Sequence, residues 1–126
     1  MLVRSVARTA GRPMEMEGAH GVTLRMMISR QDGAPNFALR HFTVDVGGHT
    51  PRHRHPYEHE NYIISGRGTV EADGEIRTIS AGDVVLVPPG ALHQYVNTHS
   101  AEPLVMLCLV PTTFDDGQGS RPVPGS

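Results

Sequence analysis

The chain has 126 residues and a formal net charge of -2, which suit one domain and give no reason to expect nucleic acid or an anionic membrane as partner. All eleven basic residues are arginine, so a Schiff-base lysine and a P-loop lysine are both excluded. The single cysteine, Cys108, excludes an intrachain disulfide. No segment approaches the roughly 20 apolar residues that a membrane span needs. We therefore expect a small cytoplasmic protein.

Short apolar segments recur at intervals of about ten residues, with turn residues between them. Residues 1–20 show no clear periodicity and are expected to form an N-terminal arm or edge strand. The expected strands are residues 22–29, 36–46, 61–65, 69–72, 75–79, 84–88, 92–97 and 103–110. Gly47-Gly48 is expected to end the second of them, and Asp73-Gly74 is a strong signal for a two-residue hairpin.

This pattern predicts an all-β fold, either a sandwich or a barrel, because no segment of useful length has a helical period. The content of 14 glycines and 10 prolines also suits a turn-rich β protein. We expect one barrel domain over residues 21–112. Residues 113–126 are rich in Gly, Pro and Ser, and we expect them to be a disordered tail.

Three histidines, His53, His55 and His59, lie within seven residues of one another. They share one parity, so an extended strand would present all three on the same face. Neutral imidazole is the commonest protein ligand of transition metals, and the cluster therefore predicts a metal site. Glu58 and Glu60 have the opposite parity and are expected to face outward, although one of them could orient a ligand imidazole.

Two segments resemble the motifs of the cupin superfamily. The first motif, a glycine, five residues, a histidine, one residue and a second histidine, is matched by Gly47, His53 and His55. The second motif is matched by Gly82, Pro88, Gly90, His93 and Asn97. This resemblance implies a double-stranded β-helix, the cupin jelly-roll barrel, in which His93 joins the histidines of the first motif at one metal.

The chain departs from the commonest cupin pattern where a glutamate ligand is expected. Counting back from the closing Gly66 reaches His59, whereas counting forward from His55 reaches Glu60. Parity favours His59, but a bulge near Pro56 would favour Glu60. The string His-Pro-Tyr-Glu-His-Glu resembles the small four-histidine cupins. The expected ligands are therefore His53, His55, His59 and His93, with Glu60 as the alternative to His59.

Four neutral imidazoles would leave the full charge of a divalent ion uncompensated. Such a centre is a strong Lewis acid and favours an anionic or enolisable oxygen ligand. Imidazole suits Fe, Ni, Cu and Zn, and the family resemblance points to Mn or Fe. We therefore expect one divalent transition metal, with Mn or Fe first and Ni, Zn or Cu as alternatives.

Four further residues are candidates for the pocket. Arg40 and Phe42 alternate on the strand before the motif; if Arg40 faces inward it could bind a substrate carboxylate, and otherwise it lies exposed on the sheet. Tyr57 could line the pocket mouth or simply pack in the core. Cys108 is expected to be a small buried hydrophobic residue, or else to approach the metal and be prone to oxidation.

The fold does not determine the function, because cupins perform many unrelated activities. Our first hypothesis is a metal-dependent oxidoreductase of the dioxygenase type, acting on a small molecule, with no separate acid–base residue identifiable. The alternatives are a non-redox isomerase, lyase or decarboxylase, and a non-catalytic protein that binds a metal or small ligand. The resemblance also implies a homodimer that exchanges N-terminal strands, for which residues 1–10 are the candidates.

Overall fold

The computed structural model describes residues 1–114, so the expected tail lies outside the described residues from residue 115 onward. The strands are β1 (Arg12–Pro13), β2 (His20–Ile28), β3 (Phe37–His49), β4 (His59–Ser65), β5 (Arg67–Ala72), β6 (Glu75–Ser80), β7 (Val84–Val87), β8 (His93–Asn97) and β9 (Leu104–Pro111). The 3-10 helices are η1 (Val6–Arg8), η2 (Arg30–Asp32) and η3 (Thr112–Phe114). Within this part of the chain, no helix is long and apolar enough to cross a membrane.

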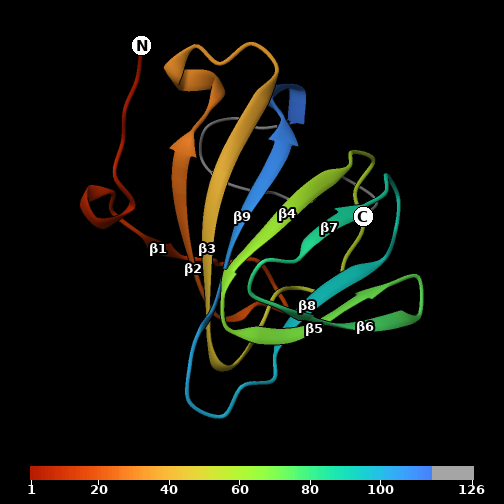
Figure 1. Ribbon diagram of the computed structural model, residues 1–126. Coiled ribbons are helices and arrows are strands. Elements are labelled where there is room, and N and C mark those ends of the chain that lie inside the picture. The colour runs from red at the N-terminus through yellow and green to blue at the C-terminus, as the bar shows by residue number, and fades with distance from the viewer. Residues whose placement is uncertain (115–126) are drawn as a thin grey trace.

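The strands form one antiparallel sheet that curls into two facing layers (Figure 1). The main path runs β6-β5-β8-β3-β9-β4-β7, and β2 pairs with β3. The 13-residue strand β3 pairs with β2 and β9 along its two edges and with β8 at its last residue, His49. It therefore joins the layer of β2, β3, β9, β4 and β7 to the layer of β8, β5 and β6. The all-β prediction is confirmed.

The core lies between the layers, and side chains alternate between buried and half-buried most regularly along β9. Along β9, Leu104, Met106, Cys108 and Val110 are buried, and the residues between them are half-buried. Ile63 of β4 faces Met106 in the register of these two strands and is also fully buried. Burial of each such apolar side chain stabilises the fold by roughly 2 kcal/mol.

Glycine closes a turn at one position and forms a bulge within a strand at another. Asp73 and Gly74 both have positive φ, at 49° and 84°, and close the predicted two-residue hairpin between β5 and β6. The prediction that Gly47-Gly48 ends a strand is wrong, since β3 continues to His49. A Cβ on Gly48 would lie 2.8 Å from the carbonyl oxygen of His20, where the β2–β3 register shifts. These glycines therefore form a bulge within the strand.

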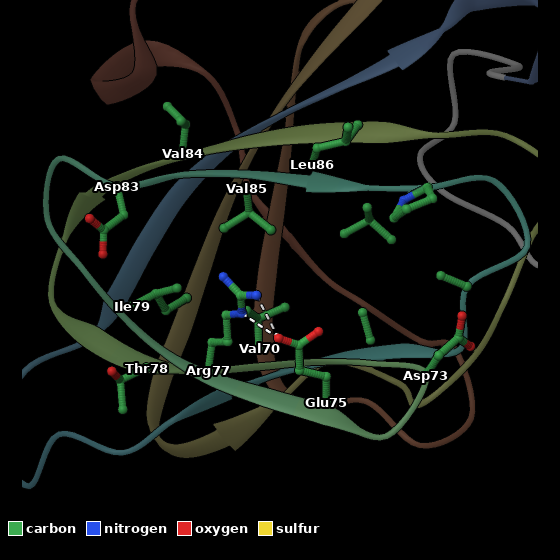
Figure 2. A pocket seen from close by; sticks show the side chains of 14 residues that line it. Val70, Asp73, Glu75, Arg77, Thr78, Ile79, Asp83, Val84, Val85 and Leu86 are labelled. Carbon is green, nitrogen blue, oxygen red and sulfur yellow. Dashed lines mark hydrogen bonds and ion pairs between the residues drawn. The ribbon is translucent and has the colours of Figure 1, made fainter.

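The two layers leave a groove of about 720 Å³ between their outer strands, β6 and β7 (Figure 2). Its apolar floor includes Val70, Ile79 and Val85, and an exposed ion pair joins Arg77 to Glu75 at 2.6 Å on β6. The residues that line this groove include no histidine or cysteine, and its two lining acids on the turns, Asp73 and Asp83, accept backbone N–H groups. The groove therefore offers no cluster of metal-ligating groups.

The N-terminal residues follow β2 of their own chain. Strand β1 pairs with β2, and the guanidinium of Arg4 donates to the carbonyl oxygen of Met27 at 2.6 Å. Arg25 on β2 donates in turn to the carbonyl oxygen of Thr9 at 3.1 Å. This course brings the segment after β1, with Met14 and Met16, to one of the cavities between the layers.

Candidate metal centre

The first two histidines of the cluster lie in the loop between β3 and β4, so the expectation that one strand carries all three is wrong. Pro51 and Pro56 lack the N–H that a strand ladder needs, and both lie within this loop. His53 forms an isolated antiparallel bridge with His93, with N–H to carbonyl distances of 3.1 and 2.9 Å. His55 is held on the other side, where its carbonyl oxygen accepts from Gly90 at 2.8 Å.

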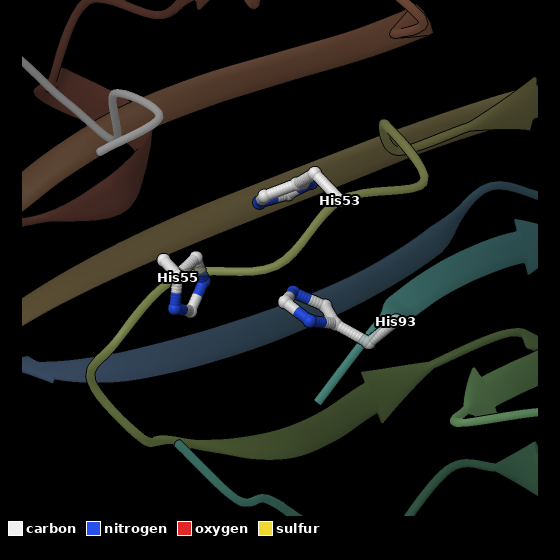
Figure 3. Close-up of side chains that lie close together, drawn as sticks. All are labelled: His53, His55 and His93. Carbon is white, nitrogen blue, oxygen red and sulfur yellow. The ribbon is translucent and has the colours of Figure 1, made fainter. Parts of the chain in front are cut away.

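Three of the four histidines nevertheless converge on one point, and His59 adjoins them. One ring nitrogen from each of His53, His55 and His93 lies within 4.8 Å of the others. Figure 3 shows these three rings gathered together. His59, the first residue of β4, places its Nε2 atom 3.1 Å from Nε2 of His93. Its ring centroid is 5.2 Å from that of His55. The loop and two strands therefore gather four imidazoles without a shared strand.

Each of these imidazoles directs its Nδ1 atom at an acceptor two residues away in the sequence. The acceptors are the carbonyl oxygens of Pro51 for His53 (3.0 Å), Tyr57 for His55 (2.9 Å) and Ala91 for His93 (2.9 Å), and Oδ1 of Asn61 for His59 (2.8 Å). Carbonyl oxygen only accepts, so Nδ1 must carry the proton in all four rings. The Nε2 atoms are therefore left as unprotonated lone pairs.

The short contact between His59 and His93 favours a cation between them. Two Nε2 lone pairs 3.1 Å apart repel each other unless a proton or a metal ion lies between them. Two nitrogen ligands that are each about 2.1 Å from one ion, at right angles, are about 3 Å apart. The distance between these two atoms therefore fits two neighbouring ligands of one metal.

A proton is poorly suited to this role at neutral pH. Burial lowers the pKa of His55 to about 3 and the pKa values of His59 and His93 to about 4, and it lowers the pKa of His53 as well. Neighbouring imidazoles also lower the pKa values of His53, His55 and His93, and Arg40 adds to the lowering for His53, His59 and His93. Four neutral imidazoles with free lone pairs could hold a divalent metal ion.

Two residues that the sequence did not indicate hold His59 in place. Asn61, next on the inward face of β4, accepts from Nδ1 of His59, and the hydroxyl of Tyr95 donates to the same oxygen at 2.7 Å. The Asn61 amide donates to the carbonyl oxygen of Leu107 at 3.4 Å, which fixes the orientation of the amide. The sequence did hold one signal for these residues. Asn61 and Tyr95 each lie two residues after a predicted ligand, His59 and His93, and therefore on the same face of the strand.

The acidic neighbours of the cluster lie on the other face of the chain. Glu58 and Glu60 are exposed, whereas His59 between them is buried. The pKa of Glu60 is raised, first by partial burial and then by the neighbouring Glu58 carboxyl. In this structure neither carboxylate faces the four histidines. Tyr57 is also absent from the lining of the cavity, since it is buried with its ring stacked on His55 at a centroid distance of 3.9 Å.

The histidines border a cavity of about 30 Å³, which has room on the order of one water molecule. Met14 and Met16 of the N-terminal segment also line this cavity. The other lining residues are Arg40, Phe42, Thr50, His53, His55, His59, Asn61, His93, Tyr95 and Met106. The metal-ligating groups are thus enclosed by aromatic, methionine and amide side chains, with no carboxylate among them.

Arg40 and Phe42 both face this interior in the structure. Arg40 is only 3% exposed, and its guanidinium lies over the Phe42 ring at 5.1 Å from the centroid. Its Nη2 atom donates to Sγ of Cys108 at 3.0 Å. Cys108 is buried in the core, and its sulfur lies 3.5 Å from Nδ1 of His59, on the side of that ring away from His93.

Comparison with known proteins agrees with this architecture. Residues 40–110 match the family described as the Cupin domain, and this span includes all four histidines. The chain belongs to the cupin family. The jelly-roll prediction is confirmed with it, since solved cupin structures superpose on most of the chain.

The relatives of this cupin differ in function. It is 35% identical to gentisate 1,2 dioxygenase 1 of Aquipseudomonas alcaligenes over 78 residues. This match covers 55% of the chain and 22% of that protein. It is also 35% identical over 72 residues to an uncharacterised protein of Methanocaldococcus jannaschii, covering 56% of the chain and 57% of that protein. The chain thus spans between about a fifth and just over half of the length of these relatives.

Among solved structures, the polyketide cyclase RemF of Streptomyces resistomycificus has a TM-score of 0.82 and 27% identity. That likeness covers 89% of this chain and 80% of the cyclase. A predicted oxalate decarboxylase of Thermotoga maritima has a TM-score of 0.78 at 24% identity, covering 88% of this chain and 98% of that chain, and shares the fold.

Proposed function

We propose that this cupin is a metal-dependent oxidoreductase of the dioxygenase type that acts on a small enolisable or anionic oxygen-donor substrate. In this proposal His53, His55, His59 and His93 hold one divalent ion. The observation that carries it is the grouping of His53, His55 and His93, with His59 beside His93, while all four Nδ1 atoms are directed at oxygen acceptors. The similarity to a gentisate dioxygenase supports the redox assignment.

The donor set suits a redox-active ion. Neutral imidazole is a good ligand for Fe, Ni, Cu and Zn, and no carboxylate lines the cavity to reduce the charge of the centre. When bound, such an ion would supply Lewis acidity toward an anionic oxygen and a route for electrons to dioxygen. Mn or Fe is our first choice of metal because the chain belongs to the cupin family, whereas the imidazole donors alone do not select one metal.

The protein's own groups would orient and enclose the reactants. The hydroxyl of Tyr95 donates a hydrogen bond to Oδ1 of Asn61. Burial raises the pKa of Tyr95, so this hydroxyl stays protonated and is not a general base. Its role is to fix Asn61, which in turn fixes the ring of His59. Met14, Met16, Phe42 and Met106 exclude bulk water from the cavity.

A non-redox reaction is the second candidate, and one observation favours it. The likeness to a polyketide cyclase covers most of both chains, whereas the dioxygenase relative is matched over about a fifth of its length. A centre that only stabilises an enolate would need the same four histidines. The two functions therefore differ in whether dioxygen is consumed.

Oxygen uptake separates the two candidates. Metal-free protein would be reloaded with Fe(II), Mn(II) or Zn(II) and mixed with gentisate or with a β-diketone in an oxygen-electrode cell. We expect uptake with Fe(II) or Mn(II), none with Zn(II), and none with His59→Ala. If no metal form takes up oxygen while the zinc form accelerates proton exchange at the enolisable carbon, the dioxygenase proposal is wrong and the non-redox function holds.

A further inference from the structure

Arg40 is a buried cation without a carboxylate partner in the described part of the chain. Four ion pairs occur there, and their cations are Arg4, Arg52, Arg77 and His99. All four of these side chains are more exposed than Arg40, which is 3% exposed. A buried arginine is ordinarily paired with an anion, because an unpaired charge is poorly solvated inside a protein.

The contacts that Arg40 does make leave this charge uncompensated. Its Nη2 atom meets the sulfur of Cys108 and its plane lies over Phe42, while its Nε atom is buried with no hydrogen-bond partner. The cavity that Arg40 lines contains no aspartate or glutamate. A divalent ion on the four neutral histidines would add two further positive charges to the same cavity.

We propose that Arg40 binds a carboxylate group of the substrate, so that the substrates of this cupin are small organic carboxylates. The proposal rests on the proposed function, because it places the carboxylate in the cavity of the candidate metal centre, which must widen beyond its volume of about 30 Å³ to admit the substrate. The planar guanidinium recognises carboxylates by charge-assisted hydrogen bonds. The anion would also offset the positive charge that the histidine-bound ion brings.

A purely structural role for Arg40 explains less. A neutral side chain could pack on Phe42 and Cys108 without leaving a donor unpaired, and replacement of a buried charge by a neutral group is often stabilising. The inward position of Arg40 on β3 follows from its register with Cys108 on β9, so the strand would accept an apolar residue there. The charge therefore has no evident use in packing.

The test uses acetate as the probe and acetamide as its neutral counterpart of the same shape. Zinc-loaded protein is diamagnetic, so ligand binding can be followed by NMR chemical-shift titration. This measurement does not depend on any redox activity of the protein. The variant Arg40→Gln removes the guanidinium. Arg54→Gln is the matched control, because it removes the same charge from an exposed position between His53 and His55.

We expect the unaltered protein and Arg54→Gln to bind acetate more tightly than acetamide, and Arg40→Gln to lose at least about tenfold in acetate affinity. Arg40→Gln should keep the zinc content and a thermal unfolding temperature no lower than that of the unaltered metal-free protein. Equal acetate affinity in Arg40→Gln, loss of zinc from it, or equal binding of acetate and acetamide by the unaltered protein would each overturn the assignment.

This design also keeps the two proposals apart. Arginine-dependent acetate binding without oxygen uptake by any metal form would retain the carboxylate assignment and reject the dioxygenase. Oxygen uptake by the unaltered protein, together with normal acetate binding by Arg40→Gln, would retain the dioxygenase and reject the carboxylate assignment.

Discussion

Hydrogen bonds to Nδ1 decide what each histidine of the cluster can do. His53, His55 and His93 donate to main-chain carbonyl oxygens, which the loop geometry itself supplies. His59 alone depends on a side chain, that of Asn61, and through it on Tyr95. The position of His59 is therefore the most easily altered by substitution outside the ring itself.

At this scale we predict that Asn61→Leu weakens metal binding. The leucine keeps a similar volume but cannot accept the Nδ1 proton, so His59 is free to rotate or to change tautomer. A loss of such a partner lowers metal affinity by about 10- to 100-fold. Isothermal titration with Zn(II) measures it, and Tyr95→Phe, which leaves the Asn61 oxygen in place, should show a smaller loss. Unchanged affinity in Asn61→Leu would mean that the amide does not position the ring.

Among the elements, the strands were predictable from the sequence because alternation and turn residues act locally. The expected strand at residues 103–110 corresponds to β9 at Leu104–Pro111, and the Asp73-Gly74 hairpin forms as expected. The convergence of the histidines was also expected, but for a wrong reason. His53 and His55 are directed by a loop that bridges to β8, and such a long-range contact leaves no periodic signal in the sequence.

The orientation of Arg40 shows a second limit of the sequence. An arginine on an alternating strand suits either face, and only the pairing of β3 with β9 places it opposite Cys108 in the interior. Tyr95 was missed because its role depends on Asn61, a neighbour 34 residues away in the chain. Pairing across the sheet, not local propensity, builds this part of the candidate site.

The turn between β4 and β5 offers a prediction at the scale of the element. Gly66 has a φ of 84°, and a Cβ there would press on the carbonyl oxygen of Pro103 and lie 2.9 Å from Cα of Leu104. We expect Gly66→Ala to lower the free energy of unfolding by on the order of 3 kcal/mol. Gly74→Ala has the same φ of 84° with nothing near its Cβ, so it should cost only about 1 kcal/mol. Urea denaturation measures both, and equal losses would argue against the close approach to Pro103.

For the molecule as a whole, the buried histidines predict how stability depends on pH. Their pKa values in the folded protein lie below the ordinary value of 6.5, at about 3 for His55 and about 4 for His59 and His93. Between pH 6.5 and 4 the unfolded chain therefore binds protons that the folded chain does not. The stability that the neutral histidines contribute is present above about pH 6.5 and is lost as the pH falls toward 4.

Thermal unfolding of the metal-free protein across this range tests the prediction. We expect the unfolding temperature to fall steadily below pH 6.5, with a shallower slope in His59→Gln, which lacks one of the titrating groups. A metal-free protein whose unfolding temperature is constant from pH 7 to pH 4 would contradict the neutral state of the cluster.

Dimer formation through residues 1–10 stays a prediction, since in this structure those residues follow β2 of their own chain.

The central claim is that the four histidines hold a metal ion, and metal content after reloading tests it most directly. Metal-free protein would be incubated with Fe(II), Mn(II) or Zn(II) under anaerobic conditions, freed of excess metal and measured by elemental analysis. We predict one equivalent of metal per chain in the unaltered protein and in Glu60→Ala, and a strongly reduced content in His59→Ala. Full metal content in His59→Ala, or no metal in the unaltered protein, would contradict the claim.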